Sequence, residues 1–149
     1  MQHIWSVLCQ KSSIDFETNL VSLFECIEDV SLVFNGTRSA NDEKVVVPIE
    51  WQLVNYWVIE DEEKENYMDL KVDFFDPDRK CLNSYEKKID IDKNLKRFRG
   101  RMNIRGFQIT KSGRYYCRVS QKIDKGYTIV SELPIDVSIS FNIQNQSLN

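Results

Sequence analysis

The stretch from Tyr127 to Ile143 constrains the fold of this chain most, because its apolar side chains recur at every second residue. Polar residues such as Glu132, Asp136 and Ser138 stand between the apolar ones. Successive side chains of a strand point to opposite faces of a sheet, whereas a helix repeats about every 3.6 residues. The stretch therefore predicts a long β-strand with one face in a core and the other toward solvent. The apolar row, which only Ser131 interrupts, consists of Tyr127, Ile129, Leu133, Ile135, Val137, Ile139, Phe141 and Ile143.

Other segments of the chain have the same period, and none has the period of a helix. We expect strands at residues 4–10, 20–34, 45–59, 67–75, 81–91, 98–104 and 114–123. Glu28 and Asp29 interrupt the second of these and predict a bend in it. Residues 1–143 are therefore expected to form a single all-β domain, an immunoglobulin-like two-sheet antiparallel β-sandwich of about eight strands. Residues 144–149 are expected to be a polar C-terminal tail.

The segment Gly113 to Cys117, G-R-Y-Y-C, resembles the G-x-Y-x-C motif of immunoglobulin-like sandwiches. In those domains the tyrosine hydroxyl bonds to the backbone at a corner, and the cysteine two residues later lies in the core. The resemblance implies these roles for Tyr115 and Cys117. An ordinary strand that begins at a Ser-Gly turn is the alternative interpretation.

Four further motifs, in their order along the chain, are similar to a family of small uncharacterised bacterial and phage proteins that are predicted to be β-sandwiches. The motifs are W-S-V-L-C-x-K-S from Trp5, S-L-F-x-x-I from Ser22, D-P-D from Asp76 and S-G-x-Y-x-x-x-V from Ser112. This resemblance implies a cytoplasmic setting. It supplies no catalytic residues.

The apolar run from Ile4 to Cys9 is too short for a secretion signal or a membrane span, so we expect a cytoplasmic protein without a membrane partner. Four cysteines stand at positions 9, 26, 81 and 117, without a C-x-x-C motif. Free and mostly buried thiols are the expectation in a reducing compartment. A bridge between Cys26 and Cys117 across the sandwich stays open as the alternative.

Sequence patterns that carry chemistry are sparse in this chain. His3 is the only histidine, and near the chain's end we expect it to face solvent. No glycine-rich phosphate loop, H-E-x-x-H motif or paired-cysteine metal site occurs among the 149 residues. We therefore predict a protein that is not an enzyme and that has no cofactor, no metal site and no catalytic residues.

The charges of the chain are unevenly distributed, although the net charge is only −3. Residues 93–123 contain ten of the 20 lysines and arginines and no carboxylate. On a strand, side chains two residues apart project from one face about 7 Å from each other. Arg97, Arg99, Arg101 and Arg105 should therefore form a basic row, with Arg114 and Arg118 pointing outward from the next strand.

Three interpretations of these arginines remain open. They could pair with carboxylates on adjacent strands, for which the candidates are Asp69, Asp73, Glu86, Asp90 and Asp92. They could instead dock an acidic protein or a second copy of this acidic chain. They could also contact the phosphates of a nucleic acid. We expect a non-catalytic protein-interaction or structural module of a bacterial or phage cytoplasmic system, with a nucleic-acid-binding accessory protein as the alternative.

Overall fold

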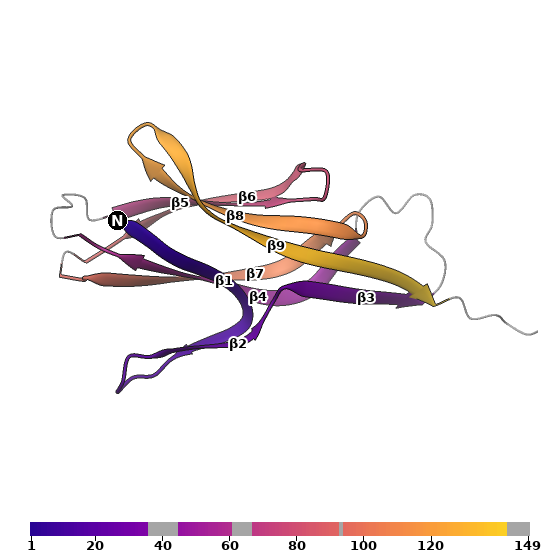
Figure 1. Cartoon of the computed structure of the whole chain (residues 1–149), viewed down its shortest axis with the longest axis horizontal. Coiled ribbons are helices and arrows are strands. Elements are labelled where there is room, and N and C mark those ends of the chain that lie inside the picture. Colours follow the sequence, from indigo (N-terminus) through magenta and orange to yellow (C-terminus); the bar gives the residue numbers. More distant parts are fainter. Residues whose placement is uncertain (36–44, 61–66, 93, 143–149) are drawn as a thin grey trace, which may run out of the picture.

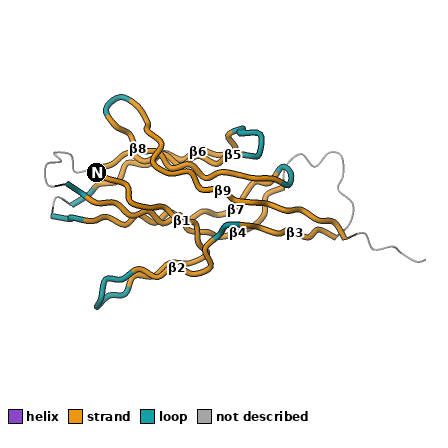
Figure 2. Tube along the Cα trace, in the orientation of Figure 1, coloured by secondary structure: helices purple, strands orange, loops and turns teal. Residues whose placement is uncertain are grey.

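The computed structural model describes residues 1–35, 45–60, 67–92 and 94–142, and this part of the chain contains nine β-strands and no helix (Figures 1 and 2). The prediction of an all-β fold is confirmed. None of the described residues belongs to a helix that could cross a membrane. The predicted tail at 144–149 lies outside the described residues.

The strands form two sheets. The four-stranded sheet has the spatial order β2 (Val21–Cys26), β1 (Gln2–Ile14), β4 (Val45–Val58) and β7 (Arg97–Ile109). The five-stranded sheet has the order β3 (Asp29–Asn35), β9 (Gly126–Asn142), β8 (Gly113–Ile123), β5 (Tyr67–Phe75) and β6 (Cys81–Asp90). All neighbouring strands are antiparallel except β3 and β9, which run parallel. The predicted two-sheet sandwich is thus present, while its immunoglobulin-like assignment stays a prediction.

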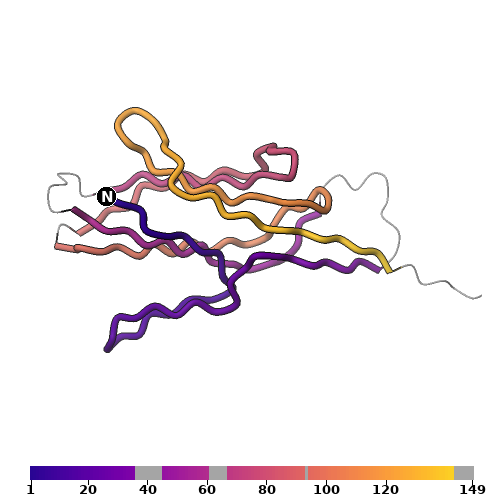
Figure 3. Tube along the Cα trace, in the orientation of Figure 1, coloured from indigo at the N-terminus to yellow at the C-terminus, as the bar shows by residue number. Residues whose placement is uncertain are grey.

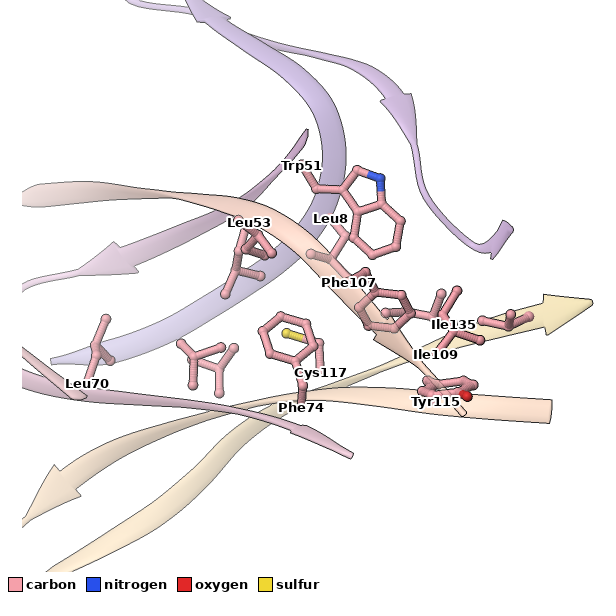
Figure 4. Packing of buried hydrophobic residues seen from close by; sticks show 14 of the residues in the cluster. Leu8, Trp51, Leu53, Leu70, Phe74, Phe107, Ile109, Tyr115, Cys117 and Ile135 are labelled. Atoms are coloured by element: carbon pink, nitrogen blue, oxygen red, sulfur yellow. The ribbon is translucent and has the colours of Figure 1, made fainter. Parts of the chain in front are cut away.

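The core lies between the inward faces of the two sheets (Figure 4). Phe107 of β7 contacts Phe74 of β5 and Tyr115 of β8, with ring centroids 6.1 and 5.4 Å apart, so aromatic packing joins the sheets. Both Trp51 and Trp57 of β4 are buried. Burying an apolar side chain of this size stabilises the fold by roughly 2–3 kcal/mol. The apolar row of β9 is buried only at its centre, at Ile135 and Val137, whereas Tyr127, Ile129 and Phe141 toward its ends are exposed.

The predicted bend at Glu28 and Asp29 is a passage from one sheet to the other. β2 ends at Cys26 beside β1, and β3 begins at Asp29 beside β9. The amide of Asp136 donates to the carbonyl of Glu28 at 2.9 Å and so begins the parallel pairing. Figure 3 shows that β3 and β9, from opposite ends of the sequence, lie side by side. One expected strand is therefore two strands in different sheets.

The hydroxyl of Tyr115 fixes the connection between β7 and β8. It donates to the carbonyl of Lys111 at 2.8 Å and lies 2.8 and 3.1 Å from the amide nitrogens of Thr110 and Lys111, which donate to it. Gly113 in the same connection has φ +143°, and a Cβ there would lie 2.8 Å from the ring of Pro77. The connection therefore needs both the tyrosine hydroxyl and the glycine.

We predict that Tyr115→Phe lowers the free energy of unfolding by about 1–3 kcal/mol, because it leaves the backbone groups at Lys111 without their partner. Urea denaturation followed by tryptophan fluorescence measures the change. Tyr85→Phe is the matched control, because the Tyr85 ring is partly exposed and its hydroxyl has no hydrogen bond among the described residues. A Tyr115→Phe protein as stable as this control would contradict the assignment.

The four cysteines are free, and only Cys9 and Cys117 are buried. The alternative of a bridge between Cys26 and Cys117 is wrong for this structure. Cys26 is exposed on β2 of the four-stranded sheet, whereas Cys117 lies inside the sandwich on β8 of the other sheet. The neighbour of Cys26 is Cys9, directly opposite it on β1. Burial raises the pKa of the Cys117 thiol far above its ordinary value, so this thiol stays protonated.

Candidate binding site

β1 belongs to two hairpins in succession. From Gln2 to Cys9 it pairs with β4, and from Cys9 to Ile14 it pairs with β2. Residues 10–26 therefore leave the sandwich as a separate hairpin, which we call the arm (Figure 1). In Figure 1 the arm is the indigo hairpin that projects away from the rest of the molecule below β1.

Side-chain hydrogen bonds shape the tip of the arm. A carboxylate oxygen of Asp15 accepts bonds from the backbone amides of Glu17 and Thr18 at 3.1 and 2.6 Å, and from the Thr18 hydroxyl at 2.7 Å. These bonds favour the charged carboxylate and lower the pKa of Asp15. Asn19 closes the turn in the left-handed region, with φ 55°, which asparagine tolerates better than most residues.

The base of the arm is tied to the sandwich by a chain of polar groups across three strands. The amide and hydroxyl of Ser12 both donate to Gln52 Oε1 of β4 at 2.7 Å. Gln52 Nε2 in turn donates to Asn103 Oδ1 of β7 at 3.1 Å. These bonds set the angle at which the arm leaves the sheet.

The six predicted site residues do not form one surface. Four of them lie on the outer face of β7, at one edge of the four-stranded sheet, whereas the other two lie on β8 in the five-stranded sheet. On each strand the arginines alternate with buried residues such as Ile104 and Cys117. The β7 arginines are Arg97, Arg99, Arg101 and Arg105, and the β8 arginines are Arg114 and Arg118.

The two arginines of β8 are neutralised by carboxylates of β9. Arg114 makes two hydrogen bonds to Asp136, of 2.7 and 2.8 Å. Arg118 bonds Glu132 at 2.9 Å, and Arg79 bonds the same carboxylate at 2.8 Å. Hydrogen bonds from these guanidinium groups lower the pKa of Asp136 and of Glu132. The interpretation as cross-strand ion pairs therefore describes β8, with partners on β9 that the sequence did not single out.

Three arginines of β7 have no such partner in the part of the chain that the structure describes. Arg97, Arg99 and Arg101 make no ion pair with any described residue, and Arg105 has only a loose one, 3.7 Å from the exposed Glu50. Their one neighbouring strand among those described is β4. The carboxylates expected beside the row, Asp69, Asp73, Glu86 and Asp90, lie on β5 and β6 in the other sheet.

A groove of about 350 Å³ separates the arm from the outer face of the four-stranded sheet. Arg99 spans it, because its Nη1 donates to Asn19 Oδ1 at the arm tip at 2.9 Å. We call this space, together with the adjoining Arg97, the arginine groove. Its lining residues are Ser12, Ile14 and Val21 from the arm and Val54, Arg99, Gly100 and Arg101 from the sheet.

Aromatic rings continue the arginine groove across the sheet. Tyr56 of β4 lies directly between Trp5 of β1 and Arg99 of β7 in the strand register. The ring centroids of Trp5 and Tyr56 are 5.6 Å apart, and the Arg99 guanidinium carbon is 5.8 Å from the Tyr56 ring. The outer face of this sheet thus combines partly exposed aromatic surface with positive charge that no described carboxylate neutralises.

The arm also exposes apolar side chains. Phe16 at its tip is fully exposed, and Ile14, Leu20 and Phe24 are each about half exposed or more. Apolar side chains exposed to this extent are typical of interaction sites when a partner covers them. The expected strands at residues 4–10 and 20–34 left the segment between them without a predicted element, so the arm was not anticipated, although Phe16 and Leu20 in a polar stretch were a signal for it.

A polar cluster around His3 was also not anticipated. The His3 ring is half-buried rather than facing solvent. Its edge packs against the Trp57 ring, and the two ring centroids are 4.8 Å apart. His3 Nε2 lies 2.8 Å from the Ser6 hydroxyl, which donates to Asn55 Oδ1 at 2.5 Å. Ser6 and Asn55 are buried, and the serine proton is directed to an amide oxygen rather than to a base. The cluster therefore joins β1 to β4 rather than activating a nucleophile.

Burial lowers the pKa of His3 below its ordinary 6.5, because the charged imidazolium is poorly solvated there. The unfolded chain therefore binds the proton more readily than the folded protein. The contribution of His3 to stability is complete above about pH 6.5 and is lost as the pH falls below it.

We predict that the free energy of unfolding decreases from pH 7 to pH 5, and that His3→Gln makes this decrease smaller. Urea titrations of both proteins at several pH values measure it. The carboxylates with lowered pKa values, Asp15, Glu132 and Asp136, act at lower pH and contribute equally in both proteins. Parallel stability profiles for the two proteins would contradict the prediction.

We also predict that Asn19→Gly loosens the arm without unfolding the sandwich. Glycine adopts the left-handed conformation readily, so only the side chain bonded to Arg99 is lost. Amide exchange in residues 10–26 should accelerate, whereas exchange in β8 should stay the same, which serves as the internal control. Unchanged exchange in the arm would show that this bond does not hold it in place.

Comparison with known proteins gives this chain no family, since no family model and no curated protein matches the sequence. Among the described residues, no group of histidine, cysteine or carboxylate side chains is arranged to hold a metal ion. The geometry of the arginine groove is therefore the basis for a functional proposal.

Proposed function

We propose that this protein is a non-catalytic protein-interaction module that binds an acidic partner in the arginine groove. One observation carries the proposal: Arg97, Arg99 and Arg101 make no ion pair with any carboxylate among the described residues, and they lie beside exposed apolar and partly exposed aromatic side chains. In the five-stranded sheet and its turns, by contrast, the described arginines bind carboxylates within the molecule, as Arg114 binds Asp136.

The composition of the groove favours a protein ligand. Arginine, tryptophan and tyrosine are the residues that dominate the binding energy of protein interfaces. A guanidinium group binds a carboxylate through two parallel hydrogen bonds, and the attraction strengthens when the partner excludes water. The exposed apolar side chains of the arm, Phe16 and Leu20 above all, supply the surface that such a partner would cover.

The proposal extends to the setting that the sequence resemblance implies, the cytoplasm of a bacterium or the interior of a phage-infected cell. The partner there is an acidic protein. A second copy of this chain is the other candidate, because the chain itself has a net charge of −3. Self-association would appear as a dimer in sedimentation experiments.

A nucleic-acid-binding accessory protein is the second candidate function. Trp5 and Tyr56 lie on an open sheet face beside Arg99, and aromatic rings on such a face can stack with the bases of a single strand. The positive row is short, however, and ends at Arg105 next to Glu50. Few phosphates could be neutralised there, so a protein ligand fits better.

We predict that Arg97→Glu combined with Arg101→Glu abolishes ligand binding while the fold is retained, because both side chains are exposed. The probe is a displayed library of random peptides selected on the wild-type protein. Selected peptides should bind the double variant at least about tenfold more weakly, since reversed charges repel acidic ligands. Fluorescence anisotropy measures the affinities, and thermal melting checks the fold.

The matched control is Lys87→Glu combined with Lys125→Glu. It changes the net charge by the same amount at two exposed positions, one on β6 and one in the turn between β8 and β9, neither of which has an ion pair among the described residues. Selected peptides should bind this control like the wild type. Equal losses in both double variants would contradict a specific site. Salt-sensitive binding of single-stranded oligonucleotides in place of peptides would favour the second candidate.

A further inference from the structure

β7 is an edge strand among the strands that the structure describes. It lies at the end of the four-stranded sheet, and β4 is its only neighbour among the described strands. Its pairing with β4 is continuous from Arg97 to Arg105. Beyond that, the register shifts near Val47 on β4, and Gly106 adopts φ +77°. An edge strand presents a row of unpaired N–H and C=O groups to which another strand can bind.

This regular part of the edge carries the arginines that make no ion pair with the described residues. Arg97, Arg99 and Arg101 project from its outer face, and Phe98 and Met102 project from its inner face, where they pack partly buried against the core. A strand added along β7 would place its own side chains alternately on these two faces. One set would meet positive charge, and the other would meet apolar surface at the rim of the core.

We infer that the ligand of the arginine groove is an extended acidic segment that adds to β7 as a further strand. Its acidic side chains lie on the outer face opposite the arginines, and its alternate apolar side chains extend the core next to Phe98 and Met102. This inference rests on the proposed function and specifies the class of its ligand. Addition of a strand to a free edge is a common mode of peptide recognition, in which backbone bonds give affinity and alternate side chains give specificity.

Charge complementarity distinguishes β7 from the other free edges. β6 carries charges of both signs along its edge, including Glu86, Lys87 and Lys88, which discourage pairing. β2 is only six residues long. β3 presents Asp29, Ser31 and Val33, without a row of one charge. Of the described edges, β7 alone combines a regular ladder with a row of positive charges, three of which make no ion pair with the described residues.

The test uses short synthetic peptides in which glutamate and valine alternate. A peptide of the same composition with glutamates and valines in separate blocks is the first control. In a strand, only every second residue turns its backbone groups toward a given neighbour. Two further versions of the alternating peptide therefore carry N-methyl groups on alternate backbone amides, one version on the amides of the glutamates and the other on those of the valines.

The inference expects unequal effects from these two methylated peptides. One methylation pattern blocks the bonds to β7 and weakens binding by about tenfold or more, whereas the other leaves the edge-facing amides free and binds like the parent peptide. The control peptide with its glutamates and valines in separate blocks should also bind weakly. Native-state hydrogen exchange should show new protection of β7 amides when the alternating peptide binds, and binding should be lost in the Arg97→Glu and Arg101→Glu variant.

Failure of this inference is separable from failure of the proposed function. Equal binding of both methylated peptides would overturn strand addition while leaving groove binding intact. If library peptides bind in an arginine-dependent way but the alternating peptide does not bind, the proposed class of ligand is wrong and the proposed function stands. Ligands that bind the arginine variant as well as the wild type would overturn the proposed function itself.

Discussion

The fold depends on the burial of the inward face of β4. Trp51, Leu53 and Trp57 are fixed in the core from the middle of the four-stranded sheet, with β1 on one side of the strand and β7 on the other. Because side chains alternate, this burial also determines what faces outward. Tyr56 must then point away from the core, between Trp5 and Arg99. The core and the candidate site are consequences of the same alternation.

Sequence periodicity predicted most of the fold for a definite physical reason. A half-buried strand requires an apolar side chain at every second position, so rows such as that from Tyr127 to Phe141 could belong only to strands. The charged pair Glu28 and Asp29 could not continue a buried row, and the chain changes sheets there. The basic row at Arg97, Arg99 and Arg101 could also be anticipated, because a segment without carboxylates cannot neutralise itself. Whether adjacent strands supply carboxylates to it could not be read from the sequence.

The assignment of each strand to a sheet could not be read in the same way. The alternation of side chains shows which residues share a face of a strand, but it does not show which strands lie beside it. Pairing between segments distant in sequence determines the neighbours. Arg114 and Arg118 follow the β7 row closely in sequence, yet they lie in the other sheet and are satisfied by β9. The arm escaped prediction because β1 continues past its partner β4, and a single strand pattern does not show where one partner is exchanged for another.

The continuity of β1 from the sandwich into the arm makes the arginine groove preorganised. The arm begins as an extension of a strand already ordered by the core, and Ser12 is bonded to Gln52 at its base. A ligand that enters the groove therefore does not have to order a flexible loop. Because the arm is already ordered in the folded protein, binding loses little conformational entropy there. Association with such a surface is expected to proceed without a slow conformational step, at a rate governed by diffusion and electrostatic steering.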